Sequence, residues 1–192
     1  RRMNVLLLRP HPGNDRFGLG PFFRVEPLGL EYVGAALRAR GHVPTVADLR
    51  FRPGAGAWVR RTRPRVVGIS CAHALEFDRV RETAREVRRA APDAFVVVGG
   101  HAAAVFPSPL ECNEIDAICL DDGEEAAPAV VEAIGKGRPM GEVPGLRLRT
   151  RDGWISTPTP AEQVSLDKVG LPARDLVERH RAGYHCLIFK PV

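Results

Sequence analysis

The sequence has no long hydrophobic run, no closely spaced cysteine pair and few lysines, and each of these absences excludes a class of protein. No apolar run approaches the roughly 18 to 20 residues that a membrane span needs. Residues 1–3 lead directly into an apolar run, so we expect no signal peptide and predict a cytoplasmic protein. The four cysteines, Cys71, Cys112, Cys119 and Cys186, form no CxxC pair and no zinc spacing, as is typical of reduced, structural thiols.

Positive charge is abundant but is carried almost entirely by arginine. The chain has 28 basic residues and a formal net charge of +5, and its lysines are Lys136, Lys168 and Lys190. The arginines are scattered along the sequence, without interleaved aromatic residues or a nucleic-acid-binding motif. We therefore predict a solvated basic surface and no nucleic-acid partner.

The sequence does contain short apolar runs that alternate with helical stripes, which are segments whose apolar residues recur about every three to four positions. The apolar runs are residues 5–8, 43–47, 66–70, 95–98 and 117–120. Helical stripes cover residues 30–37 before Gly41, 80–91, and 127–134 before Gly135, with a weaker helix at 57–63. This alternation predicts an α/β fold, doubly wound and flavodoxin-like, with a five-stranded parallel sheet in the order 2-1-3-4-5.

The character of the sequence changes after the third stripe. Residues 146–150 and 154–156 flank Asp152-Gly153, which predicts a β-hairpin, and residues 157–160 (TPTP) form a stiff linker. We therefore divide the chain into a Rossmann-like domain at 1–138 and a hairpin and linker at 139–192. The apolar run 186–189 lies near the end of the sequence, so we expect it to lack a partner strand and to be loosely ordered.

Unusual loops follow four of the predicted strands. They are residues 9–13 (RPHPG), 70–72 (SCA), 99–101 (GGH) and 121–124 (DDGE). Open α/β sheets bind ligands at the carboxyl ends of their strands, and glycine lets a ligand approach the backbone closely. We therefore expect Gly13, Ser70, Gly99 and Gly123 to lie on a common rim that binds a ligand.

Three other functions of α/β folds lack their motifs. The nearest approach to a dinucleotide-binding GxGxxG is Gly18-Leu19-Gly20, which is followed by residues 21–23 (PFF) without the third glycine. A phosphoacceptor receiver domain needs acidic residues where Arg9 and Ser70 stand. Ser70 also lacks the glycine-flanked elbow of a hydrolase nucleophile.

A series of short motifs runs through the chain in this order: 4–10 (NVLLLRP), 26–31 (EPLGLE), 32–37 (YVGAAL), 41–42 (GH), 66–70 (VVGIS), 98–101 (VGGH), 123–125 (GEE) and 171–176 (LPARDL). Taken together, these motifs resemble the amino-terminal cobalamin-binding domain of cobalamin-dependent radical S-adenosylmethionine enzymes. Within that family, residues 26–31 are most similar to the hopanoid-type methylases.

The resemblance implies that the chain binds cobalamin and carries no catalytic residue or metal ligand of its own. The corrin would lie over the rim, with the nucleotide tail in a cleft beside Ser70, Gly99 and Gly100. We therefore expect Gly100→Leu to abolish binding while the fold persists. The implied cofactor-binding residues are Pro10, His11, Leu28, Gly29, Ser70, Cys71, Ala72, Gly99, Gly100, His101, Asp122, Gly123 and Glu124.

The resemblance also implies a partner. In this family the 4Fe-4S cluster and S-adenosylmethionine belong to a radical SAM barrel of the same parent chain, whose CxxxCxxC motif is absent from these residues. The fragment should therefore bind cofactor without turnover. A rival interpretation is a degenerate, cofactor-free domain that serves only for docking, and co-elution with hydroxocobalamin discriminates the two.

Two loops depart from related patterns. Stand-alone corrinoid proteins carry Asp-x-His-x-x-Gly, in which the aspartate orients a histidine that ligates cobalt from below. Here His11 follows Arg9-Pro10, without that aspartate, so we expect no bond from His11 to cobalt. The family's usual Gly-Glu-Gly-Glu begins here with Asp121, which leaves that loop's contact open. His73 and His101 are interpreted as rim or helix-capping residues.

Overall fold

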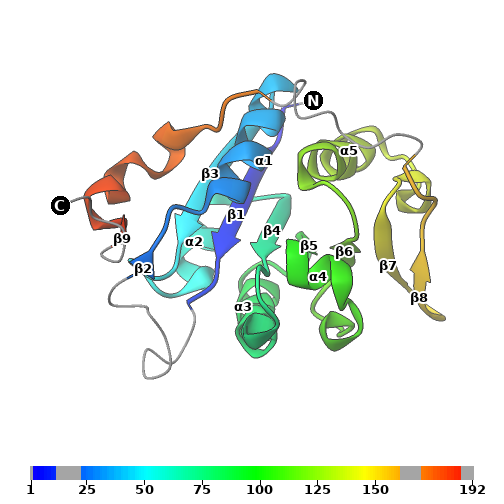
Figure 1. Cartoon of the computed structure of the whole chain (residues 1–192). Helices are drawn as coiled ribbons and strands as arrows, with labels where there is room; N and C mark the ends of the chain where they lie inside the picture. Colours follow the sequence, from blue (N-terminus) through cyan, green and yellow to red (C-terminus); the bar gives the residue numbers. More distant parts are fainter. Residues whose placement is uncertain (1, 12–22, 161–169, 187–192) are drawn as a thin grey trace.

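The computed structural model describes residues 2–11, 23–160 and 170–186, and their core is a seven-stranded sheet (Figure 1). Its order is β3-β1-β4-β5-β6-β7-β8, and a separate pair is formed by β2 and β9. The strands are β1 (Asn4–Arg9), β2 (Phe23–Arg24), β3 (Val43–Asp48), β4 (Val66–Ser70), β5 (Phe95–Gly99), β6 (Ala117–Cys119), β7 (Leu146–Thr150), β8 (Gly153–Ser156) and β9 (His185–Cys186).

The five strands β3, β1, β4, β5 and β6 run parallel to one another. Strand β1 is buried on both faces from Val5 to Leu8, which explains its continuous apolar sequence. Because each parallel strand ends at the same edge, Ser70 is paired with Gly99 across β4 and β5. The α/β class and the parallel core of the prediction are therefore confirmed.

The prediction of a five-stranded sheet is wrong, because the hairpin β7–β8 extends the sheet. Strand β7 pairs antiparallel with β6, and β8 pairs antiparallel with β7. The carboxylate of Asp116 fixes this edge, accepting hydrogen bonds from Arg149 (2.6 Å), Arg88 (2.6 Å) and the Val96 N–H (2.8 Å). The order across the sheet thus includes two strands that the sequence-based prediction left outside it.

Helices cover both faces of the sheet. They are α1 (Leu28–Ala39), α2 (Ala55–Thr62), α3 (Phe77–Ala90), α4 (His101–Val105) and α5 (Gly123–Lys136). Helices α1 and α5 contact each other and share one core cluster, whereas α2 and α3 pack in the other (Figure 1). Helix α5 ends at Lys136 and is capped by Gly137, whose φ is +64°, so the predicted end at Gly135 is corrected. None of the described helices is long and apolar enough to cross a membrane.

The segment 170–186 returns to the β3 edge of the sheet. It contains a 3₁₀ stretch, Arg174–Gly183, followed by β9. Strand β9 pairs antiparallel with β2, so the prediction that the run 186–189 lacks a partner strand is wrong for Cys186. Residues 187–189 lie outside the described residues.

Candidate functional site

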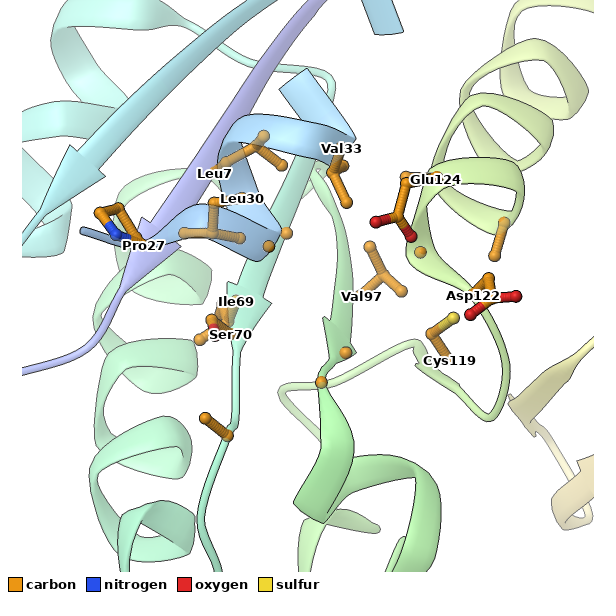
Figure 2. A pocket seen from close by; sticks show the side chains of 18 of the residues that line it. Leu7, Pro27, Leu30, Val33, Ile69, Ser70, Val97, Cys119, Asp122 and Glu124 are labelled. Carbon is orange, nitrogen blue, oxygen red and sulfur yellow. The ribbon is translucent and has the colours of Figure 1, made fainter. Parts of the chain in front are cut away.

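A cleft of about 650 Å³ lies on the sheet face that is covered by α1 and α5 (Figure 2). Its floor comes from β1, β4 and β5, through Leu7, Gly68 and Val97. One wall is the first half of α1, with Leu30 and Val33, and the other is the start of α5. The mouth lies where β1, β4, β5 and β6 end, and the volume is in the range of small-molecule sites.

Two glycines determine the width of the cleft. A Cβ at Gly68 would lie 2.9 Å from Cδ2 of Leu7, so a side chain there would displace the floor. A Cβ at Gly123 would lie 3.1 Å from Cγ2 of Val33, so a side chain at the start of α5 would crowd the wall formed by α1. The cleft therefore depends on having glycine, which has no side chain, in β4 and at the start of α5.

The two glycines at the end of β5 have different roles. A Cβ at Gly99 would make ordinary contact, 3.5 Å, with Cβ of Cys119. Gly100 has a φ of +111°, and a Cβ there would lie 2.6 Å from the carbonyl oxygen of Cys71. Glycine is thus required at position 100 by the fold itself. The expectation that Gly100→Leu leaves the fold intact is wrong.

Ser70 and Arg9 are polar groups at the mouth. Ser70 ends β4, and within the described residues its hydroxyl has no hydrogen-bond partner, so it is available to a ligand. Arg9 ends β1, and its Nε is buried and likewise unpartnered. Burial lowers the pKa of Arg9, and the charge of Arg50 lowers it further.

The start of α5 gives the opposite side of the mouth a negative charge. Asp121, Asp122 and Glu124 line the cleft there, and none forms an ion pair with an arginine or lysine of the described ranges. The last two are at the helix N-terminus, where a carboxylate is favourable. Beside them, the Cys119 thiol donates to the Asp121 carbonyl oxygen (3.1 Å), and burial raises its pKa to about 11.

Most of the predicted site residues meet in this cleft. Those that line it are Leu28, Gly29, Ser70, Ala72, Gly99, Gly100, His101, Asp122, Gly123 and Glu124. Those that do not line it are Pro10, His11 and Cys71. Cys71 is fully buried in the core of the opposite face, and burial raises its pKa to about 12. Gly13 lies outside the described residues.

The two other histidines of the rim lie beside short helices. His73 precedes the 3₁₀ turn Ala74–Glu76, where its N–H donates to the Glu76 carboxylate (3.3 Å). His101 is the first residue of α4. Within the described residues, no three His, Cys, Asp or Glu side chains are grouped so that they could hold a metal ion.

Sequence reasoning missed the floor and part of the α1 wall, and it did not assign Arg9 to the site. The floor residues read as ordinary strand core, because a buried strand has the same pattern whether it faces a helix or a cleft. Leu30 and Val33 of the α1 wall belong to a helical stripe that was predicted, but not as part of the site, and Pro27, which precedes α1, was quoted only in the motif 26–31. Arg9 begins the loop 9–13 that the sequence marked as unusual, but its lack of a hydrogen-bond partner is visible only in the structure.

Comparison with known proteins identifies a family. The family model described as B12 binding domain matches residues 21–131, which include α1, β4, β5 and the start of α5. Hopanoid C-3 methylase from Methylococcus capsulatus is 34% identical over 166 residues, an alignment that covers 83% of this chain and 31% of that relative. These matches confirm the resemblance to cobalamin-binding domains that the motifs indicate.

Solved structures share the fold. The radical S-adenosylmethionine methyltransferase TsrM from Kitasatospora setae, with cobalamin and a 4Fe-4S cluster bound, is 25% identical with a TM-score of 0.72, over 89% of this chain and 31% of that one. The cobalamin-dependent S-adenosylmethionine radical enzyme OxsB, with aqua-cobalamin bound, has a TM-score of 0.74 at 16% identity, over 95% of this chain and 25% of that one. The chain spans about a third of the length of the curated relatives.

Proposed function

This chain belongs to the B12 binding domain family, and we propose that it is the cobalamin-binding part of a radical S-adenosylmethionine methyltransferase. The observation that carries the proposal is the glycine-edged cleft at the carboxyl edge of the parallel sheet, inside the region that the family model matches. An open α/β sheet binds its ligand at this edge. The relatives with methyltransferase names support the wider assignment.

The residues of the cleft fit the nucleotide tail of the cofactor. Its floor is apolar, as a planar aromatic base requires, and Gly99 offers no side chain at the mouth. The unpartnered hydroxyl of Ser70 can hydrogen-bond to a polar group of the tail. The corrin is too large for the cleft and would rest over the mouth, near Ala72, Gly100 and His101. When bound, cobalamin supplies methyl-transfer chemistry, while this chain binds and orients it.

The remaining chemistry would reside elsewhere in the parent protein. The relatives are about three times longer than this chain, and the CxxxCxxC motif of a radical SAM barrel is absent from these residues. We propose that residues 1–138 form the cofactor-binding unit and that 139–192 lead to that barrel, in a cytoplasmic enzyme. The barrel would hold the 4Fe-4S cluster and S-adenosylmethionine.

The binding proposal is tested with the purified chain and hydroxocobalamin. We expect visible absorbance to co-elute with the protein in gel filtration at a one-to-one ratio. A well-folded chain that elutes colourless would overturn the proposal and favour a cofactor-free docking domain. The wider assignment is tested on the full reading frame of the parent gene, whose product should carry CxxxCxxC and bind an iron–sulfur cluster after reconstitution.

A further inference from the structure

The geometry points to Arg9 as the residue that holds the phosphodiester of the cofactor's nucleotide tail, an inference that rests on the proposed function. Arg9 begins the loop 9–13 that the sequence marked as unusual, but it was not among the implied cofactor-binding residues. It is the last residue of β1 and lines the cleft where the tail would enter.

Arg9 is a largely buried cation without a hydrogen-bonded counter-ion. Its side chain is 19% exposed, and its Nε has no hydrogen-bond partner among the described residues. The nearest carboxylate contact that we find is Oε1 of Glu76, at 4.0 Å, which is beyond hydrogen-bonding distance. A buried charge in this state is costly unless a partner is supplied.

The neighbouring carboxylates are already engaged by other groups. Oε2 of Glu76 accepts the N–H groups of Ala72 (2.9 Å) and His73 (3.3 Å). Asp48, at the end of the adjacent strand, accepts from Nη2 (2.6 Å) and Nε (2.9 Å) of Arg50. The hydroxyl of Tyr184 also donates to Asp48, at 3.2 Å. Within the described residues, the guanidinium of Arg9 therefore has no carboxylate that accepts a hydrogen bond from it.

The charges around the mouth favour an anion at Arg9. Among the described residues that line the cleft, Arg9 is the one arginine or lysine. The lining carboxylate nearest to α1, Glu26, is paired with Arg174 (3.1 Å), whereas no such pair is found within the described ranges for the carboxylates at the start of α5, Asp121, Asp122 and Glu124. A helix N-terminus would otherwise attract a phosphate, but these carboxylates repel one. An anionic group is thus directed to the β1 side of the mouth.

Cobalamin offers two kinds of oxygen acceptor, the amide carbonyls of the corrin periphery and the phosphodiester of the tail. Both can accept from a guanidinium, but the phosphodiester also neutralises its charge, and its paired oxygens match the planar guanidinium fork. The phosphodiester joins a corrin side chain to the ribose that carries the base, so it must lie near the mouth when the base occupies the cleft. We therefore assign the phosphodiester to Arg9.

The test compares hydroxocobalamin with aquocobinamide, which lacks the nucleotide tail. Dissociation constants are measured by absorbance titration for the wild-type chain, Arg9→Gln, Arg9→Lys and the control Arg65→Gln. Arg65 is exposed and precedes β4 at the opposite edge of the sheet. We expect Arg9→Gln to weaken cobalamin binding roughly 10- to 100-fold, the effect of losing a charge-assisted hydrogen bond. Arg9→Lys keeps the charge but loses the paired hydrogen bonds, so it should restore only part of the binding, and Arg65→Gln should change nothing.

Binding of aquocobinamide should be equally strong in the wild-type chain and Arg9→Gln. An equal loss for both ligands would place Arg9 against the corrin amides, and no loss for either would remove it from the site; both overturn the assignment. If aquocobinamide binds too weakly, ³¹P NMR of bound cobalamin decides, because the phosphorus resonance must differ between wild-type and Arg9→Lys. A wild-type chain that binds no cobalamin would instead refute the proposed function, and melting curves identify a misfolded variant.

Discussion

A valine at position 99 should obstruct the cleft without disturbing the fold. Residues 97 and 99 of β5 both line the cleft, as the two-residue period of a strand requires, while Val96 and Val98 face the opposite core. A side chain at position 99 therefore points into the cleft. Its Cβ would make only ordinary contact with Cys119, and Gly99 has no left-handed backbone conformation that a side chain would strain.

The magnitude follows from the volume that the substitution adds. Overfilling a packed site by methyl groups costs about 1–3 kcal/mol. If that cost falls on the complex, Gly99→Val should weaken cobalamin binding about 5- to 150-fold. Gly99→Ala should have a much smaller effect, because its single Cβ is accommodated beside Cys119.

The assay is an absorbance titration with hydroxocobalamin, accompanied by thermal denaturation. Gly141→Val is the matched control: a Cβ there meets nothing within 4 Å, and Gly141 does not line the cleft. Gly100 is unsuitable for this purpose, since any side chain there strains the fold itself. Binding by Gly99→Val that equals the wild type, with an unchanged melting temperature, would refute the placement of the tail.

Three further predictions concern single side chains. We expect His11→Ala to leave the visible and paramagnetic spectra of bound cobalamin unchanged; lost nitrogen hyperfine splitting would prove a cobalt bond. Glu31 is fully buried without a hydrogen-bond partner, and burial raises its pKa. Because its pKa is raised in the folded state, the stability that Glu31 contributes is present below the ordinary glutamate pKa and is lost as pH rises through the raised one. Glu31→Met should therefore raise the melting temperature at about pH 7.5 and change it little near pH 4. Asp116→Ala removes the carboxylate that accepts hydrogen bonds from Arg88 and Arg149, so it should lower the free energy of unfolding by about 3 kcal/mol. Urea denaturation measures this, and an unchanged midpoint would contradict it.

The fold was predictable where local pattern and tertiary environment agree. Strand β1 and helix α3 carry uninterrupted signals, because their buried positions contact the core all along their length. The hairpin was predicted from its Asp-Gly turn, but its place beside β6 was not. That pairing depends on Asp116 meeting Arg149, 33 residues away, and alternation within a strand does not reveal which edge it joins.

The site was predictable at its mouth and not in its depth. Loop residues such as Ser70 and Gly99 are unusual after a strand, so the sequence singles them out. Leu7 and Val97 have the composition of any core strand, and only the arrangement of α1 and α5 makes them the floor of a cleft. The role of Arg9 could not be predicted from the sequence, because the absence of a hydrogen-bond partner depends on which groups surround it in the folded structure.

The side chains that line the cleft are carried by strands and helices, whose regular backbone holds them in place before a ligand arrives. Three parallel strands form the floor, and the two helices are joined at the surface by Arg40, which pairs with Glu125 (3.3 Å) and Glu132 (3.0 Å). A ligand entering such a cleft need not order the walls, so little conformational entropy is lost there on binding. The free energy of the contacts is then available for affinity, and specificity is decided by shape and charge at the mouth.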